Sequence, residues 1–361
     1  MLKRLPLHER HMELGAKMGE FAGFYMPMYY RGVIEEVRSV REKVGMFDVS
    51  HMGEFSIRGK GAFEFVNYIT VNDVGKLKPF SAQYSMMCNT EGGIVDDLIV
   101  YRLEGDEFIL VVNAANISKD YEWVRENSRK FKVQVEDISD RTVLIAVQGP
   151  KAIEMVDELT EGKVSQIRRF EMTRSKIDNV RVTISRTGYT GEDGVEIYIS
   201  SEDSVKVWDR LIERGKKYNM AVCGLIARDM LRLEAGLPLY GNDIDETTTP
   251  WEAKLGWVVK LNKGEFIGKE SLRLKKEKMT RHRVGIIVRE AKAVPRKGQL
   301  LYFGDEEIGY ITSGGYSPTL GCGIGMGYVN ITYGVGTKVE VDIRGKRVNA
   351  EIVKLPFYRG S

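Results

Sequence analysis

The sequence predicts an α+β protein of more than one domain. At 361 residues the chain is long enough for two or three domains with ample core. Up to about residue 275, strand patterns alternate with helix patterns, whereas from 283 onward only strands and glycine turns follow. We therefore expect residues 1–275 to form two mixed α/β subdomains and residues 276–361 to form a C-terminal β-barrel or jelly-roll domain.

The N-terminal region combines helical patterns with an aromatic run. Apolar spacing predicts helices over 8–17 and 31–44, the second ending at Gly45. The aromatic run at 21–30 lies between them and favours core or a subunit contact over a cofactor site. His51 follows alone at a strand boundary, where a structural role is expected rather than that of a general base.

The remaining elements follow from the same spacing rules. Helices are expected over 61–74, 117–131, from 151 onward, 224–236 and 269–278. C-terminal strands are expected over 284–288, 299–303, 307–313, 325–331, 338–343 and 347–355. Asn116 or Ser118 would cap the helix at 117. The strand over 143–148 and the helix after it look like a second copy of an earlier strand–helix theme.

The segment 84–116 has the most unusual pattern in the chain, three short apolar runs separated by glycine-containing turns, which is typical of an antiparallel meander. In the middle run, side chains alternate between two faces, so each face carries a single carboxylate, Asp96 or Asp97. These carboxylates could be solvated or paired near the turn. Alternatively one faces a ligand in an apolar pocket, and Asp97 is the better candidate because Tyr101 shares its face.

A second candidate cluster lies at 185–199, where glycines at 188, 191 and 194 predict a tight loop between two strands. Such a loop is usually a plain hairpin, but here Tyr189 is followed by Glu196, which can face inward. A carboxylate in that position can accept two parallel hydrogen bonds from an amidine-like edge.

A third cluster occupies the helix predicted at 224–236. Arg228 and Arg232 are one turn apart, and Asp229 is placed to pair with Arg232. Arg228 is therefore freer to bind an anion, although an ordinary salt bridge on the helix surface is an equal alternative. Tyr240, in the long loop that follows, is a plausible wall of the same cavity.

Composition excludes several classes of protein. The 54 basic and 51 acidic side chains leave a formal charge of +3, too small to indicate a nucleic-acid partner. Three widely spaced cysteines and four histidines predict no metal site and reduced, structural thiols. The N-terminus shows no signal-peptide pattern and no apolar stretch has the composition of a membrane span, so a cytosolic protein with no membrane partner is expected. Phosphate-loop, HExxH and GxSxG motifs do not occur.

Ordered blocks along essentially the whole chain resemble the glycine cleavage T-protein, the tetrahydrofolate-dependent aminomethyltransferase. The blocks are MFDVSHMGE at 46–54, GGIVDDL at 92–98, GYTGEDG at 188–194, ARD at 227–229, LEAG at 233–236 and YSPTLG at 316–321. The resemblance implies a central cavity between two folate-binding N-terminal subdomains, with tetrahydrofolate as co-substrate and a lipoylated H-protein as partner. An aminomethyl group on the lipoyl arm would meet the folate, ammonia would leave, and 5,10-methylenetetrahydrofolate and dihydrolipoyl H-protein would result.

The resemblance also assigns expected roles. Asp97 would be the catalytic carboxylate, orienting the folate nitrogens and balancing positive charge that develops there rather than acting covalently. Glu196 would hold the pterin donors, and Arg228 would bind a folate carboxylate. The remaining side chains expected to line the folate slot are Met52, Tyr84, Tyr101, Asn113, Tyr189 and Tyr240. Core filling is an equally good interpretation for Met52.

Two alternatives share this fold. One is a non-catalytic folate-binding module of the kind that assists iron–sulfur cluster assembly, in which a Lys-Gly-Cys-aromatic-x-Gly-Gln block is expected. The comparable block at 263–269 has Glu265 in place of the cysteine and Lys269 in place of the glutamine, which argues against that function. The other is a folate-dependent demethylase or methyltransferase that uses a small methylated donor, and only donor choice separates it from the first hypothesis.

Overall fold

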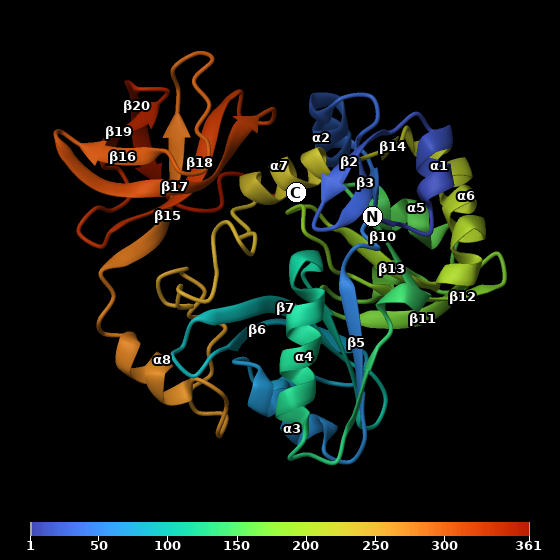
Figure 1. The fold of residues 1–361 in the computed structure, drawn as a ribbon. Coiled ribbons are helices and arrows are strands. Elements are labelled where there is room, and N and C mark those ends of the chain that lie inside the picture. The colour runs from blue at the N-terminus through green and yellow to red at the C-terminus, as the bar shows by residue number, and fades with distance from the viewer. Residues whose placement is uncertain (1, 361) are drawn as a thin grey trace.

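A computed structural model describes residues 2–360 and shows two mixed α/β lobes and a C-terminal barrel (Figure 1). The barrel lies beside the long helix α7 (Leu225–Glu234), and the two sheets of the N-terminal lobes stand on its other side. The predicted α+β class and the C-terminal β-barrel are confirmed.

The first lobe is a five-stranded antiparallel sheet in the order β6-β7-β8-β5-β9. Its strands are β5 (Gly53–Arg58), β6 (Ser81–Cys88), β7 (Ile94–Arg102), β8 (Glu107–Val112) and β9 (Gln134–Asp137). Helices α3 (Ala62–Ile69) and α4 (Ile117–Ser128) bury apolar side chains against one face of this sheet. The predicted meander is β6, β7 and β8, and its other face is left for the site.

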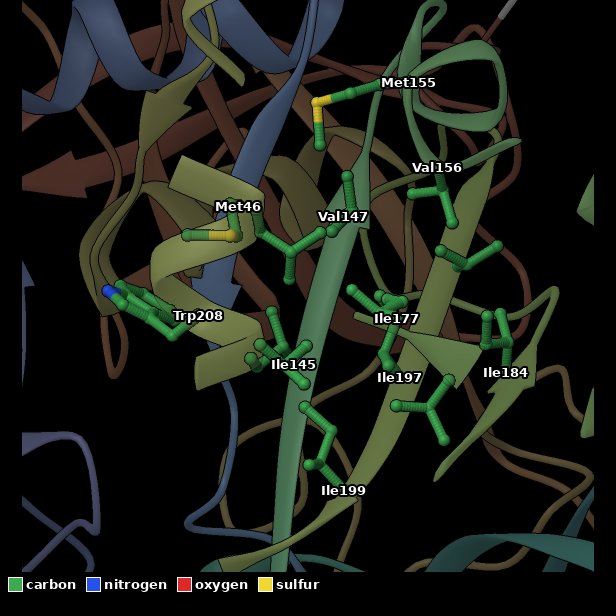
Figure 2. Close-up of a cluster of buried hydrophobic side chains, with 14 of the residues drawn as sticks. Met46, Ile145, Val147, Met155, Val156, Ile177, Ile184, Ile197, Ile199 and Trp208 are labelled. Carbon is green, nitrogen blue, oxygen red and sulfur yellow. The ribbon is translucent and has the colours of Figure 1, made fainter. Parts of the chain in front are cut away.

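The second lobe is a six-stranded sheet in the order β11-β12-β13-β10-β4-β14. Its strands are β4 (Gly45–Asp48), β10 (Thr142–Gln148), β11 (Met172–Ile177), β12 (Val180–Ser185), β13 (Gly194–Ser200) and β14 (Ala221–Val222). Helices α5 (Ala152–Asp157) and α6 (Ser204–Gly215) cover it. Trp208 of α6 packs near Met46 and Ile145 in the buried cluster between these layers (Figure 2).

The two lobes repeat one topology. In the first, β5 is followed by α3, the β6–β7–β8 meander and α4; in the second, β10 is followed by α5, the β11–β12–β13 meander and α6. Within each sheet the first strand of the unit pairs with the last strand of its meander, giving the orders β6-β7-β8-β5 and β11-β12-β13-β10. The second copy of the strand–helix theme is therefore confirmed.

The N-terminal segment forms a small sheet of its own. Strand β1 (Lys3–Arg4) pairs with β3 (Phe24–Tyr29), which pairs with β2 (Lys17–Phe21). Helix α1 (His8–Glu13) ends earlier than predicted, because Gly15 takes a positive φ of 74° and turns the chain into β2. Helix α2 (Val33–Glu42) then packs on α7.

The C-terminal domain is a closed six-stranded barrel in the order β15-β18-β17-β16-β19-β20. Its strands are β15 (Arg281–Val288), β16 (Leu300–Phe303), β17 (Glu306–Ser317), β18 (Cys322–Asn330), β19 (Lys338–Ile343) and β20 (Lys346–Val353). All six predicted strands are confirmed within a few residues. Helix α8 (Lys269–Lys275) precedes the barrel.

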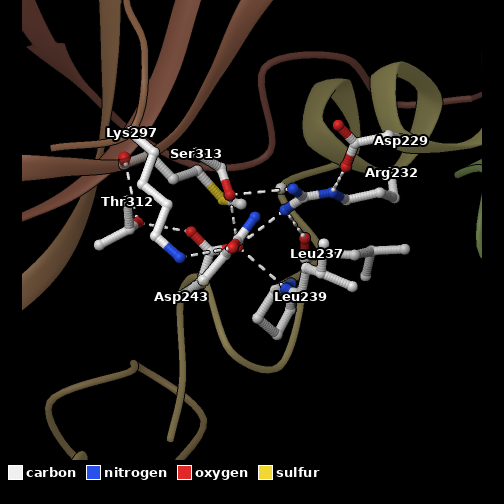
Figure 3. Close-up of polar contacts among 12 residues, drawn as sticks. Asp229, Arg232, Leu237, Leu239, Asp243, Lys297, Thr312 and Ser313 are labelled. Carbon is white, nitrogen blue, oxygen red and sulfur yellow. Dashed lines mark hydrogen bonds and ion pairs between the residues drawn. The ribbon is translucent and has the colours of Figure 1, made fainter. Parts of the chain in front are cut away.

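A buried polar network joins the barrel to α7. Arg232 donates hydrogen bonds to Asp229 on its own helix, to Asp243 at 2.7 Å and to Ser313 of β17 at 2.9 Å (Figure 3). Asp243 also accepts a hydrogen bond from Thr312 at 2.5 Å. The predicted Asp229–Arg232 pair is confirmed, and the wider network fixes the loop after α7 against the barrel.

Candidate active site

A cavity of about 930 Å³ opens between the two sheets, α7 with its following loop, and the near edge of the barrel. The nine side chains singled out in the sequence come from five separate stretches of the chain, yet all of them line this cavity. They are Met52, Tyr84, Asp97, Tyr101, Asn113, Tyr189, Glu196, Arg228 and Tyr240. Their convergence is a property of the fold, because no local pattern places these stretches together.

Asp97 lies on β7 and faces the cavity. Its Oδ2 accepts a hydrogen bond from the Tyr84 hydroxyl and its Oδ1 accepts one from the Asn113 side-chain amide, both at 2.9 Å. Burial, together with the adjacent charge of Asp96, raises the pKa of Asp97 to about 7. No lysine or arginine within residues 2–360 forms an ion pair with this carboxyl. It is therefore oriented by neutral donors and keeps its charge available to a ligand.

Asp96 points away from the cavity because strand side chains alternate, and a bulge in β7 lies directly before it. Cys88 pairs with Ile94 and Met87 with Asp96, so Val95 has no opposite partner. The prediction of strict alternation along this strand was wrong at this end: Val95 joins the core under α3 and α4, on the same side as Leu98. The two consecutive carboxylates face different environments through ordinary strand alternation, as the sequence predicted, and the bulge changes only the side to which Val95 points.

Hydrogen bonds satisfy Asp96 completely. Its oxygens accept from the Asn113 backbone N–H at 3.0 Å, the Asn113 side-chain amide at 2.9 Å and the Asn116 side-chain amide at 2.7 Å. Asn116 occupies the N-cap position of α4 but its side chain makes no capping hydrogen bond there, so the predicted capping role was wrong. Its amide instead ties the helix start to the bulge.

Glu196 lies across the cavity on β13. Its Oε2 accepts a hydrogen bond from the Thr187 hydroxyl at 2.5 Å, and Thr187 also lies 3.1 Å from the hydroxyl of Tyr101. Burial raises the pKa of Glu196 above its ordinary value, and the nearby Arg228 opposes that shift. These hydrogen bonds from Tyr101 through Thr187 fix the Glu196 carboxyl, and Glu196 still lines the cavity.

Arg228 is a cation without a protein anion. Its guanidinium lies over the Tyr189 ring at 4.7 Å, and among residues 2–360 it makes no hydrogen bond or ion pair. Burial lowers its pKa, although an arginine remains charged. An unpaired buried cation beside a cavity is a ready site for an anionic group of a ligand.

His51 also borders the cavity, although the sequence favoured a purely structural role. It is 3% exposed, and its ring stands edge-on to Phe21 at 5.8 Å. Burial and the charge of Arg228 lower its pKa to about 3, so the imidazole is neutral at physiological pH. It can offer a ring nitrogen to a ligand but not a positive charge.

Several lining residues were not predicted. Trp257 is 64% exposed and stacks on Tyr84, with 6.2 Å between ring centroids. The aromatic run at 21–30 was expected to be core, and Phe24 and Met26 are; however, Phe21 and Met28 line the cavity. The C-terminal segment reaches back to the cavity through Lys354, Leu355 and Pro356, and the barrel contributes Arg283.

The site therefore combines two kinds of group within one cavity that has aromatic side chains in its walls. On β7 the Asp97 carboxyl is held by neutral donors, whereas Glu196 of β13 and Arg228 of α7 line the cavity from other elements. Within residues 2–360 no group of three or more His, Cys, Asp or Glu side chains is arranged to hold a metal ion. In the same part of the chain, no helix has the length and apolar character needed to cross a bilayer.

Comparison with known proteins gives full-length matches. Residues 7–263 match the profile of the GCVT N-terminal domain, and residues 281–359 match the glycine cleavage T-protein C-terminal barrel domain. The aminomethyltransferase of Thermotoga neapolitana is 47% identical over 360 residues, covering 100% of this chain and 99% of that protein. That of Thermotoga maritima is 48% identical over 361 residues with the same coverage. The crystal structure of glycine cleavage system aminomethyltransferase T from Bartonella henselae superposes with a TM-score of 0.92 at 36% identity, covering 100% of this chain and 99% of that one.

Proposed function

Because this chain belongs to the glycine cleavage T-protein family, we infer that it is an aminomethyltransferase of the glycine cleavage system. The match spans both domains and covers 99% of the length of these relatives. The alternatives of an iron–sulfur assembly module and of a small-donor methyltransferase are not supported, because these relatives are named as aminomethyltransferases.

The co-substrate that fits the cavity is tetrahydrofolate, which supplies the two nitrogens that accept the methylene group. The supporting observations are a carboxyl that lines the cavity and a guanidinium that forms no ion pair with a described residue. Glu196 can accept hydrogen bonds from the pterin donor edge, and Arg228 can bind a carboxylate of the folate tail. Tyr84 and Trp257 supply aromatic surface for a flat ring system.

Asp97 is the group we assign to catalysis. Its negative charge stabilises positive charge that develops on the transferred carbon and its nitrogen neighbours. Tyr84 and Asn113 hold the carboxylate in place before the substrate arrives, so no reorganisation is needed during the reaction. Burial of the Asp97 carboxyl strengthens this electrostatic effect.

The donor is the lipoyl arm of an H-protein that carries an aminomethyl group, and ammonia is the leaving product. A long, thin arm suits a cavity that is open on one side and bounded by Trp257 and the C-terminal segment. This protein supplies the Asp97 carboxylate and the folate-binding cavity, and the H-protein supplies the one-carbon group that is transferred. No nucleophile of this chain takes part in the proposal.

The observation that carries this proposal is Asp97 on a cavity wall, opposite the unpaired Arg228. A single-turnover assay with aminomethylated H-protein, tetrahydrofolate and this protein should release one ammonia per H-protein. A parallel reaction with a free methylated amine in place of H-protein should release none. Absence of ammonia in the first reaction, or an equal rate in the second, would overturn the proposal.

A further inference from the structure

A second cavity of about 760 Å³ lies between the same two sheets, and Tyr101 lines both cavities. It is bounded by β11, β12 and β13 of the second lobe and by Leu103 and Ile109, which flank the turn between β7 and β8 of the first. No role assigned above involves it, apart from the Tyr101 ring that separates the two spaces.

The internal repeat relates this cavity to the first one. The first cavity is lined by the segment before β5, by β6–β8, and by the β12–β13 turn of the other lobe. The second is lined by the segment before β10, by β11–β13, and by the β7–β8 turn. Each element that lines the first cavity thus has its repeat equivalent in the lining of the second. The repeated topology therefore forms two cavities of comparable size.

The interior end of the second cavity carries an unsatisfied carboxyl. Glu54 is 1% exposed, and neither of its carboxyl oxygens has a hydrogen-bond partner among the described residues. The Tyr198 hydroxyl beside this end makes no hydrogen bond of good geometry with a described residue, and the Tyr101 hydroxyl is its polar neighbour. Buried polar groups without partners are rare in folded proteins because each carries a desolvation cost. Glu54 and Tyr198 both line this cavity, which points to a ligand that satisfies these groups.

The protonation of the Glu54 carboxyl limits which chemical groups of a ligand can bind to it. Burial, with the charges of Asp137 and Glu196 nearby, raises the pKa of Glu54 well above its ordinary value, which favours the neutral carboxyl. A neutral carboxyl presents one O–H donor and one carbonyl acceptor side by side. Its complement is an edge with an adjacent N–H and C=O, as in a ring lactam.

The exposed end of the cavity is basic. Four basic side chains line this end, and Glu161 is the one exposed carboxylate among the lining residues. The basic residues are Arg141, Arg174, Lys176 and Arg181. Exposed ion pairs hold three of these cations, but such pairs are weak and exchangeable. Arg181 forms no hydrogen bond or ion pair with any described residue. This end is therefore suited to a carboxylate or a phosphate.

We propose that the second cavity binds a flat lactam-bearing heterocycle with an anionic tail, held at the ring by Glu54 and Tyr198 and at the tail by Arg181. Apolar side chains between the two ends, Ile138 and Met172 among them, supply the walls for the ring. Two sources share this chemistry: a second folate, whose tail is a carboxylate, and a guanine nucleotide, whose tail is a phosphate.

Calorimetric titration of the full chain with 5-formyltetrahydrofolate and, separately, with GMP tests the proposal. At least one probe should show a binding event that Glu54→Met weakens at least tenfold and Arg181→Ala weakens several-fold. Glu54→Gln should retain it, because an amide also presents a donor beside an acceptor. The same event should survive Glu196→Ala, because Glu196 lines only the first cavity.

The pattern of outcomes identifies the source. Two equivalents of 5-formyltetrahydrofolate falling to one in Glu54→Met indicate a second folate, and GMP binding that is lost in Glu54→Met indicates a nucleotide. The proposal is wrong if neither probe shows a Glu54-dependent event, or if Glu196→Ala abolishes all binding. Should Glu54→Met fail to fold, the exposed substitution Arg181→Ala and the conservative Tyr198→Phe give the same test.

Discussion

The hydroxyl of Tyr84 donates a hydrogen bond to Oδ2 of Asp97 at 2.9 Å, across the β6–β7 hairpin. The same tyrosine ring stacks on Trp257, so one side chain both orients the carboxylate and forms the wall next to it. Asn113, the residue directly after β8, completes the arrangement by donating to the other oxygen of Asp97. The geometry of the carboxylate is thus fixed from β6, from β7 and from the end of β8.

Replacing Asp97 with asparagine should remove most turnover while leaving folate binding nearly unchanged. The substitution keeps the size of the side chain but removes the negative charge that opposes developing positive charge. Losses of about 100- to 1,000-fold in kcat are typical when one electrostatic contact to a transition state is removed. Ammonia release gives kcat and fluorescence titration gives the folate Kd. Near-normal turnover would rule out the catalytic role of Asp97.

The pH dependence of turnover should report Asp97 directly. Its folded pKa is raised to about 7, so the active carboxylate form accumulates as pH rises and activity should increase through a midpoint near pH 7. Tyr84→Phe removes a hydrogen bond that stabilises the charged form, so the midpoint should move upward by about 0.5 to 1 pH unit. A pH–rate profile of both proteins is the measurement. A downward shift, or a profile flat around pH 7, contradicts the assignment.

Truncation of Glu196 should act on binding rather than on chemistry. Hydrogen bonds to charged groups contribute about 1.5–3 kcal/mol, so Glu196→Ala should weaken folate binding roughly 10- to 100-fold. The rate at saturating folate should fall much less, because Asp97 remains in place. Separate Kd and kcat measurements distinguish the two effects. An unchanged Kd would show that the pterin is held elsewhere.

Much of the site could be predicted because its chemistry lies in local patterns. An aspartate inside an apolar strand and an arginine without a helical partner are visible in the sequence, and Asp97 and Arg228 both line the cavity. The bulge at Val95 was not predictable, since alternation is the rule that it breaks. Trp257 comes from a segment without periodicity and Leu355 from the end of a predicted strand, and only the packing of barrel, loop and lobes brings them to the site.

Arg228 and Arg232 are one turn apart on α7, yet their substitution should have opposite consequences. Arg228→Met removes a buried cation that has no protein partner, so stability should be unchanged or higher while folate affinity falls. Arg232→Met leaves Asp243 buried without its cation and should cost about 3–5 kcal/mol of unfolding free energy. Urea unfolding and folate titration of both variants test the contrast. Equal loss of stability in both would contradict it.

Stability should fall with rising pH because of Asp120 on α4. Its carboxyl is fully buried beside Asp96, and desolvation followed by that neighbouring charge raises its pKa to about 11, with Lys119 opposing the shift. The folded protein therefore keeps a proton on this pair that the unfolded chain has already lost above about pH 5. The stabilisation is complete below the unfolded pKa and is lost progressively as pH rises towards the folded pKa.

The expected slope from this pair is about 1.4 kcal/mol of unfolding free energy per pH unit between roughly pH 5 and 9. Asp120→Asn keeps a donor for Asp96 without requiring a bound proton, so the variant should show a shallower slope and a higher Tm at pH 8 than the unsubstituted protein. Asp106, exposed in the turn after β7, provides a matched control as Asp106→Asn, which should leave the slope unchanged. Other buried carboxyls such as Glu54 titrate in the same direction, and the difference between the two variants isolates the contribution of Asp120. If the unfolding free energy falls with pH at the same slope in Asp120→Asn and in Asp106→Asn, then Asp96 and Asp120 do not share a proton.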